Sequence, residues 1–78
     1  MDVRMLDLVT TKYLTKKVMA EMELEGLINR PPADKNVDQI SNEIMLKISD
    51  IRNISSDIQT WEGFVAQITK NPEGENNK

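Results

Sequence analysis

The second half of the chain carries an apolar heptad pattern that runs for five repeats, and this pattern constrains the fold more than any other feature. Counted from Val37, nine of the ten core positions are apolar, and Lys47 is the exception. Alternating steps of three and four residues keep these positions on one stripe of a helix, where they face a partner helix. The pattern predicts an all-α fold with one long helix over residues 37–70. The predicted oligomer seam consists of Val37, Ile40, Ile44, Ile48, Ile51, Ile54, Ile58, Trp61, Val65 and Ile68.

At the one polar core position, Lys47, the neighbouring Ile48 is expected to take over the seam. A small local rotation of the helix would turn Ile48 inward and leave the lysine stem along the surface. β-Branched residues at both kinds of core position favour three or four strands over two. A parallel dimer would also set Asp57 against Glu62 of the neighbouring helix, a like-charge contact. We therefore expect a homo-oligomer, with a trimer or tetramer favoured over a parallel dimer.

The first part of the chain has no proline or glycine before Gly26, and we expect a helix over residues 2–25. Asp2 is expected to cap its start, and Gly26 is expected to end it in the left-handed conformation. At about 100 degrees per residue, its apolar side chains divide between two faces, so that this helix requires two neighbours. One face holds Leu6, Val9, Tyr13, Ala20 and Leu24, and the other holds Val3, Leu14, Val18 and Met22.

Residues 26–36 are expected to form the turn of an antiparallel helical hairpin, because they contain the Pro31-Pro32 pair. Asn36 followed by Gln39 resembles a capping box, which would open the second helix. Such a hairpin has a long heptad-patterned second helix and only a thin core of its own. We therefore expect it to complete its core as an oligomeric coiled coil or helical bundle.

The end of the chain is polar and is expected to leave the helix. Asn71-Pro72 is predicted to end the second helix, and residues 71–78 are predicted to form a disordered tail because they lack an apolar anchor. The domain organisation predicted from these breakers is a single helical hairpin over residues 1–70, followed by the tail.

An antiparallel pairing around the Pro-Pro turn predicts where the first helix runs out. It places Lys12 near Asp50 and Arg4 near Asp57, which carry opposite charges. The first helix would then end near Trp61, and the rest of the second helix would have no cover within the chain. Aromatic anchors dominate interface energies, so this overhang is the predicted partner-binding site. Its residues are Trp61, Phe64, Val65 and Ile68.

One alternative to assembly is a monomer, in which the heptad stripe is simply the buried face of a long helix. The stripe would then pack on the first helix, and Trp61 would fill the end of that core. Five heptads are long for such a face, because one shorter helix does not wrap both sides of the stripe.

Composition and charge restrict the class of function. Thirteen acidic residues against 10 basic ones give a net charge of -3, which disfavours a nucleic-acid partner. The chain has no cysteine and no histidine, the side chains that most often serve as nucleophile, base or metal ligand. We therefore expect no enzyme activity, no cofactor and no metal. The apolar runs are short and no signal-peptide pattern is present, which predicts a cytoplasmic protein without a membrane partner.

One segment resembles the end of the recognition helix and the start of the wing in winged-helix repressors, where a Gly-Leu-Ile-x-Arg turn is common. Its residues are Lys17-Val18-Met19-Ala20-Glu21-Met22-Glu23-Leu24-Glu25-Gly26-Leu27-Ile28-Asn29-Arg30. With Lys12 and Lys16 just upstream, the resemblance implies contact with DNA. A helix C-cap explains the same Gly-Leu-Ile residues without DNA.

Taken together, these patterns predict a non-enzymatic helical protein-protein interaction module that acts as an oligomerising adaptor, scaffold or assembly factor. Two alternatives remain. One is a small acidic inhibitor or modulator of a larger enzyme, which would bind through the Trp61 overhang. The other is a truncated winged-helix-like DNA-binding regulator, whose affinity for DNA would fall with salt.

Overall fold

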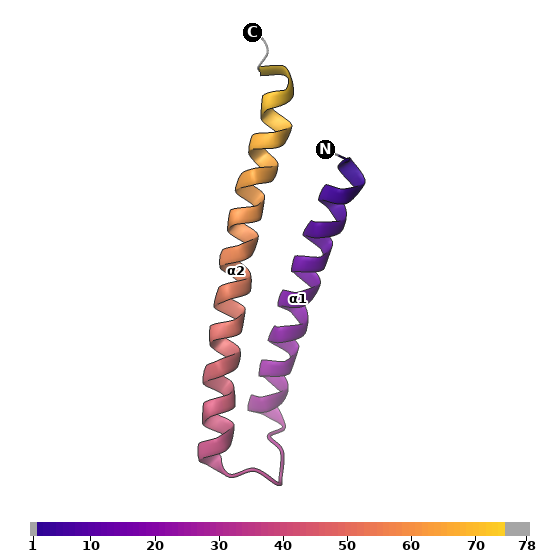
Figure 1. Ribbon diagram of the computed structural model, residues 1–78. Helices are drawn as coiled ribbons and strands as arrows, with labels where there is room; N and C mark the ends of the chain where they lie inside the picture. Colours follow the sequence, from indigo (N-terminus) through magenta and orange to yellow (C-terminus); the bar gives the residue numbers. More distant parts are fainter. Residues whose placement is uncertain (1, 75–78) are drawn as a thin grey trace.

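The computed structural model describes the backbone of residues 2–74 and the side chains of residues 2–69. Two helices make up this part, α1 (Val3–Asn29) and α2 (Val37–Gly74). They pack against each other in opposite directions, and the start of α1 lies at the same end as the last turns of α2 (Figure 1). The predicted all-α antiparallel hairpin is confirmed.

Local side chain to backbone hydrogen bonds define where both helices begin. The Asp2 carboxylate accepts from the backbone N–H of Arg4 at 2.9 Å, as expected of an N-cap. At α2, the Asn36 side chain accepts from the Gln39 N–H at 2.8 Å, and the Gln39 side chain accepts from the Asn36 N–H at 3.0 Å. This reciprocal pair satisfies two helix-end donors and confirms the predicted capping box.

The end of α1 differs from the prediction. Gly26 has no positive φ and lies within the helix, which continues for three more residues to Asn29. The closing bond runs from the Arg30 N–H to the Gly26 carbonyl at 2.8 Å. Leu27 explains the extension, because it is half-buried on the side that faces α2. Burying a leucine contributes about 1.5–3 kcal/mol when complete, which offsets the cost of about 0.5–1 kcal/mol for a glycine inside a helix.

The end of α2 also lies beyond the prediction. The helix passes through Asn71-Pro72 and ends at Gly74. Of the predicted tail, residues 71–74 are therefore helical, and residues 75–78 lie outside the described part. The prediction of a tail that begins at residue 71 is therefore corrected for residues 71–74, and its remainder falls on residues that the structure does not describe.

The register between the helices corrects the predicted pairing. Trp61 donates to Thr10, and Lys47 pairs with Glu23, so α1 does not run out at Trp61. The predicted partnership of Arg4 with Asp57 is wrong, since the recorded ion pair of Arg4 is with Asp2 at 3.7 Å. The predicted contact of Lys12 with Asp50 is wrong too, because this register brings Asp50 beside Glu23 instead.

The path of the connecting segment explains this shift. Residues 30–36 run beyond the last turn of α1 before α2 begins, so the first turn of α2 projects past α1 (Figure 1). Val37, at that first turn, is 80% exposed. Prolines favour an extended path for such a segment. Of the predicted turn over residues 26–36, residues 26–29 therefore belong to α1, and the chain reverses within residues 30–36, where the Lys35 N–H donates to the Pro32 carbonyl at 3.4 Å.

The core between the helices is thin. Within the described part only Leu6 and Ala20 are buried, at 8% and 7% exposure, and both lie on α1. The chain measures 63 × 18 × 14 Å, and its radius of gyration is 18.2 Å. A compact domain of this length has a radius of gyration of about 11 Å. The hairpin is thus a rod whose two helices cover each other on one side only.

Candidate interaction surface

The apolar heptad stripe of α2 faces α1. Eight of the predicted seam residues are half-buried in the hairpin, and two, Val37 and Ile48, are exposed. Lys47 stays on the side that faces α1, so the expected local rotation that would bring Ile48 inward is wrong. The half-buried residues are Ile40, Ile44, Ile51, Ile54, Ile58, Trp61, Val65 and Ile68. Their role as an oligomer seam stays a prediction.

The contact between Thr10 and Trp61 fixes the register of the layers. A step of four residues back along α1 and forward along α2 leads from this pair to Leu6 and Val65, and heptad steps from there give four layers of facing residues. Every member of the resulting four layers is buried or half-buried, which agrees with this register. The layers are Leu6 with Val65, Tyr13 with Ile58, Ala20 with Ile51, and Leu27 with Ile44.

A short hydrogen-bonded relay holds the indole of Trp61. The Trp61 Nε1–H donates to Thr10 Oγ1 at 2.9 Å, and the Thr10 hydroxyl donates to the carbonyl of Leu6 at 2.9 Å. The indole N–H only donates hydrogen bonds. The Thr10 hydroxyl is a suitable acceptor, because its own hydrogen is engaged in a hydrogen bond to a backbone carbonyl. Trp61 is thereby tied to α1 in one orientation.

Among the described side chains, a second polar contact between the helices is an ion pair. Lys47 Nζ lies 2.6 Å from Glu23 Oε1. This hydrogen bond raises the pKa of Lys47, and the neighbouring carboxylates of Glu23, Asp50 and Glu43 add to the effect while partial desolvation opposes it. The lysine stem lies among apolar neighbours and its charge is paired at the edge, which is the ordinary way to place lysine at a core position.

A second lysine pair braces the connecting segment. Lys35 pairs with Glu43 in the second turn of α2, and the hydrogen bond between them raises the pKa of Lys35. Asp34 adds a smaller attraction of the same sign. This contact ties the connecting segment to α2 rather than to α1, in keeping with the projection of the first turn of α2.

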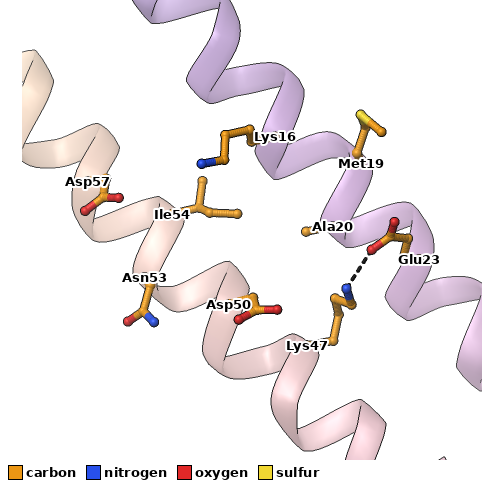
Figure 2. A pocket seen from close by; sticks show the side chains of 9 residues that line it. All are labelled: Lys16, Met19, Ala20, Glu23, Lys47, Asp50, Asn53, Ile54 and Asp57. Atoms are coloured by element: carbon orange, nitrogen blue, oxygen red, sulfur yellow. Dashed lines mark hydrogen bonds and ion pairs between the residues drawn. The ribbon is translucent and has the colours of Figure 1, made fainter.

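One side of the hairpin is an open, charged groove (Figure 2). Met19, Ala20 and Ile54 form its apolar part, and the ion pair of Lys47 with Glu23 crosses it. We call its five ionised residues the charged flank. They are Lys16, Glu23, Lys47, Asp50 and Asp57.

The opposite side of the hairpin is more apolar over its central turns. Lys16 and Asp50 each precede a residue that faces the other helix, and both lie on the side of the charged flank. Leu14 and Ile48 each follow such a residue. In two antiparallel helices, this places Leu14 and Ile48 together on the opposite side. Two shallow hollows lie here, one on α1 around Leu14 and Val18 and one on α2 around Met45 and Ile48. We call these four residues the apolar flank.

Thirteen large apolar side chains are exposed in the described part. The expected second face of α1 is confirmed, because Val3, Leu14, Val18 and Met22 are among them. Met45 and Leu46 were not among the predicted surface residues, because they lie outside the heptad stripe of α2. Counting apolar residues off the stripe would have found them. The other exposed members are Met5, Leu8, Met19, Ile28, Val37, Ile48 and Phe64.

The predicted partner-binding residues do not form an uncovered overhang. Trp61, Val65 and Ile68 are half-buried on the side of α2 that faces α1. Phe64 is 56% exposed and is the member of the set that remains open to solvent. The register explains the difference, because α1 extends alongside α2 for about two turns more than the predicted pairing allows. Contact between a partner and these residues stays a prediction.

The winged-helix resemblance does not extend to the backbone. The residues that would begin a wing, from Gly26 to Asn29, continue α1 instead, and the next element is α2. Over the described residues, neither helix combines the length and the apolar composition that crossing a bilayer requires. In the same part of the chain, no three metal-binding side chains stand close enough to hold an ion together.

Comparison with known proteins identifies no relative of this chain. No model of a protein family, no curated protein and no solved structure matches the chain.

Proposed function

We propose that this chain is a non-enzymatic helical interaction module that self-associates and acts as an oligomerising adaptor, scaffold or assembly factor. The observation that carries the proposal is the amount of apolar surface outside the hairpin core. Thirteen large apolar side chains are exposed, whereas two apolar residues are buried, among the residues described. A surface of this kind is typical of proteins that bind another protein.

The total surface supports the same conclusion. The chain exposes 6030 Å². A folded monomer of 8.9 kDa exposes about 4,800 Å². The excess, about 1,200 Å² per chain, is of the size that one partner contributes to a stable homodimer. Burial of this excess by assembly would reduce the exposed area per chain to the value expected of a compact protein.

The half-buried heptad stripe gives a second argument. Isoleucine at a core position stabilises a helix bundle most when its whole side chain is removed from water, at about 25 cal/mol per Å². In the single hairpin α1 covers residues such as Ile51, Ile54 and Ile58 only in part. More helices around the stripe would complete this burial, which is the state that β-branched residues at both core positions favour. The cytoplasmic location stays a prediction from the sequence.

Light scattering across a tenfold dilution, with helicity followed by circular dichroism, tests the proposal. We expect a highly helical species whose mass is a multiple of 8.9 kDa and decreases on dilution. A helical monomer at every concentration would contradict self-association. The exposed apolar surface would then belong to the binding of a different protein, as in the inhibitor alternative.

A further inference from the structure

The two flanks of the hairpin differ in charge over its central turns. The charged flank consists of five ionised residues, which are Lys16, Glu23, Lys47, Asp50 and Asp57. The apolar flank holds Leu14, Val18, Met45 and Ile48, and the ionised residues on the same side over these turns are Glu21 and Glu25 on α1 and Arg52 on α2. Burying the charged flank would desolvate five charges, whereas burying the apolar flank would desolvate three, two of which can pair across the interface. One flank is therefore suited to burial and the other to water.

We propose that a second copy of this chain packs its apolar flank against the same flank of the first, and that the two hairpins form a four-helix bundle. This inference rests on the proposed function and names the surface and the partner. It also specifies an orientation, in which the two-fold axis runs along the rod and α1 of one copy lies beside α2 of the other, antiparallel to it.

The area argues for a second copy as the occupant. An excess of about 1,200 Å² on each chain corresponds to an interface of about 2,400 Å² when two identical chains share it, within the range of obligate homodimers. Four helices also give the stripe of α2 neighbours on both of its sides. This is the arrangement that isoleucine at both core positions favours.

Charge complementarity argues for the orientation. Glu21 and Arg52 lie one residue to either side of the layer of Ala20 and Ile51, so their heights along the rod differ by about 3 Å. A two-fold axis along the rod keeps these heights and sets Glu21 of one copy near Arg52 of the other, twice per dimer. Among the described side chains, the recorded ion pairs are Arg4 with Asp2 and the two lysine pairs, which leaves both of these groups available.

Two variants on the same helix test the choice of flank. Ile48→Glu places a charge on the apolar flank, and Leu46→Glu places one beside Glu43, Lys47 and Asp50 on the other side. Ile48 is 48% exposed and Leu46 is 66% exposed, so both hairpins should fold. By sedimentation equilibrium we expect Ile48→Glu to raise the dimer dissociation constant at least about tenfold, and Leu46→Glu to change it by less than about threefold.

A charge exchange tests the orientation. Glu21→Arg and Arg52→Glu should each raise the dissociation constant by about fivefold, because each sets two like charges together twice per dimer. The double variant should return the constant to within about twofold of the original, since the facing pair is restored in reverse. Circular dichroism of each variant reports whether the hairpin itself keeps its helicity.

The outcomes separate this inference from the proposed function. If the natural chain remains a monomer, both are overturned. If it assembles but Leu46→Glu weakens assembly as much as Ile48→Glu does, the apolar flank is the wrong surface while self-association stands. If Ile48→Glu dissociates the dimer and the charge exchange brings no recovery, the two hairpins do not pack in the orientation proposed.

Discussion

The two helices of the hairpin use their apolar residues differently. α1 is 27 residues long and supplies both buried side chains, yet eight of the 13 exposed large apolar side chains also lie on it. α2 is 38 residues long and supplies the other five. α2 thus concentrates its apolar residues on one stripe, and α1 distributes them around its circumference. A helix with one stripe needs one neighbour, whereas α1 has the pattern of a helix between two.

The largest effect is expected when two leucines of α1 are each replaced by alanine in separate variants. Leu6→Ala removes a buried side chain and should lower the free energy of unfolding by about 2 kcal/mol. Leu14→Ala removes a side chain that is 48% exposed and should lower the same quantity by less than about 0.5 kcal/mol in dilute solution. Urea unfolding measures both. Equal effects would mean that α1 does not have one covered face and one open face.

A smaller effect is expected at the glycine inside α1. A methyl group added at Gly26 meets nothing within 4 Å. Because the backbone is helical there, Gly26→Ala should stabilise the hairpin by about 0.5–1 kcal/mol. Gly63→Ala on α2, where the added methyl is equally free, is the matched control and should act in the same direction. Destabilisation by Gly26→Ala alone would indicate that α1 ends in a left-handed glycine after all.

The relay at Trp61 should contribute a similar or slightly smaller amount. Thr10→Val keeps the shape of the side chain but removes the acceptor of the indole N–H, which should cost about 0.5–1 kcal/mol. Thr11→Val, at the exposed neighbouring position, should leave the urea midpoint almost unchanged. If the two variants behave alike, Trp61 is not tied to α1 in the register described.

The smallest effect is a loss of stability at high pH. Glu23 raises the pKa of Lys47 above its ordinary value of 10.5 in the folded chain. The pair therefore stabilises the hairpin fully below that ordinary value and loses its contribution as the pH rises through the higher folded value. Thermal melts between pH 9 and pH 12 should show a smaller decline for Lys47→Met than for the natural chain. A decline of the same size in both would exclude a contribution from this pair.

Features set by neighbouring residues in the chain were predictable from the sequence. The cap at Asp2 and the box of Asn36 with Gln39 depend on side chains that reach the backbone two or three residues away. The stripe of α2 was equally predictable, since its 3–4 spacing is a property of the helix alone. These features established the fold class and the direction of the chain.

Features set by contacts between the helices were not predictable in the same way. A glycine such as Gly26 commonly ends a helix. Here α1 continues past it, because Leu27 of α1 is half-buried against α2. The register depends on the path of residues 30–36, and a periodic sequence pattern in the helices does not predict that path. The place of Lys47 depends on Glu23, 24 residues earlier. The error in the register shifted the predicted cover of Trp61, and with it the predicted binding site.

We expect a second copy of the chain to stabilise the hairpin further by covering its open faces. The dependence of the melting temperature on protein concentration tests this most directly, because assembly stabilises the folded chain by mass action. With circular dichroism at concentrations about a hundredfold apart, we expect the midpoint to rise with concentration. A cooperative melt with the same midpoint at every concentration would contradict the claim.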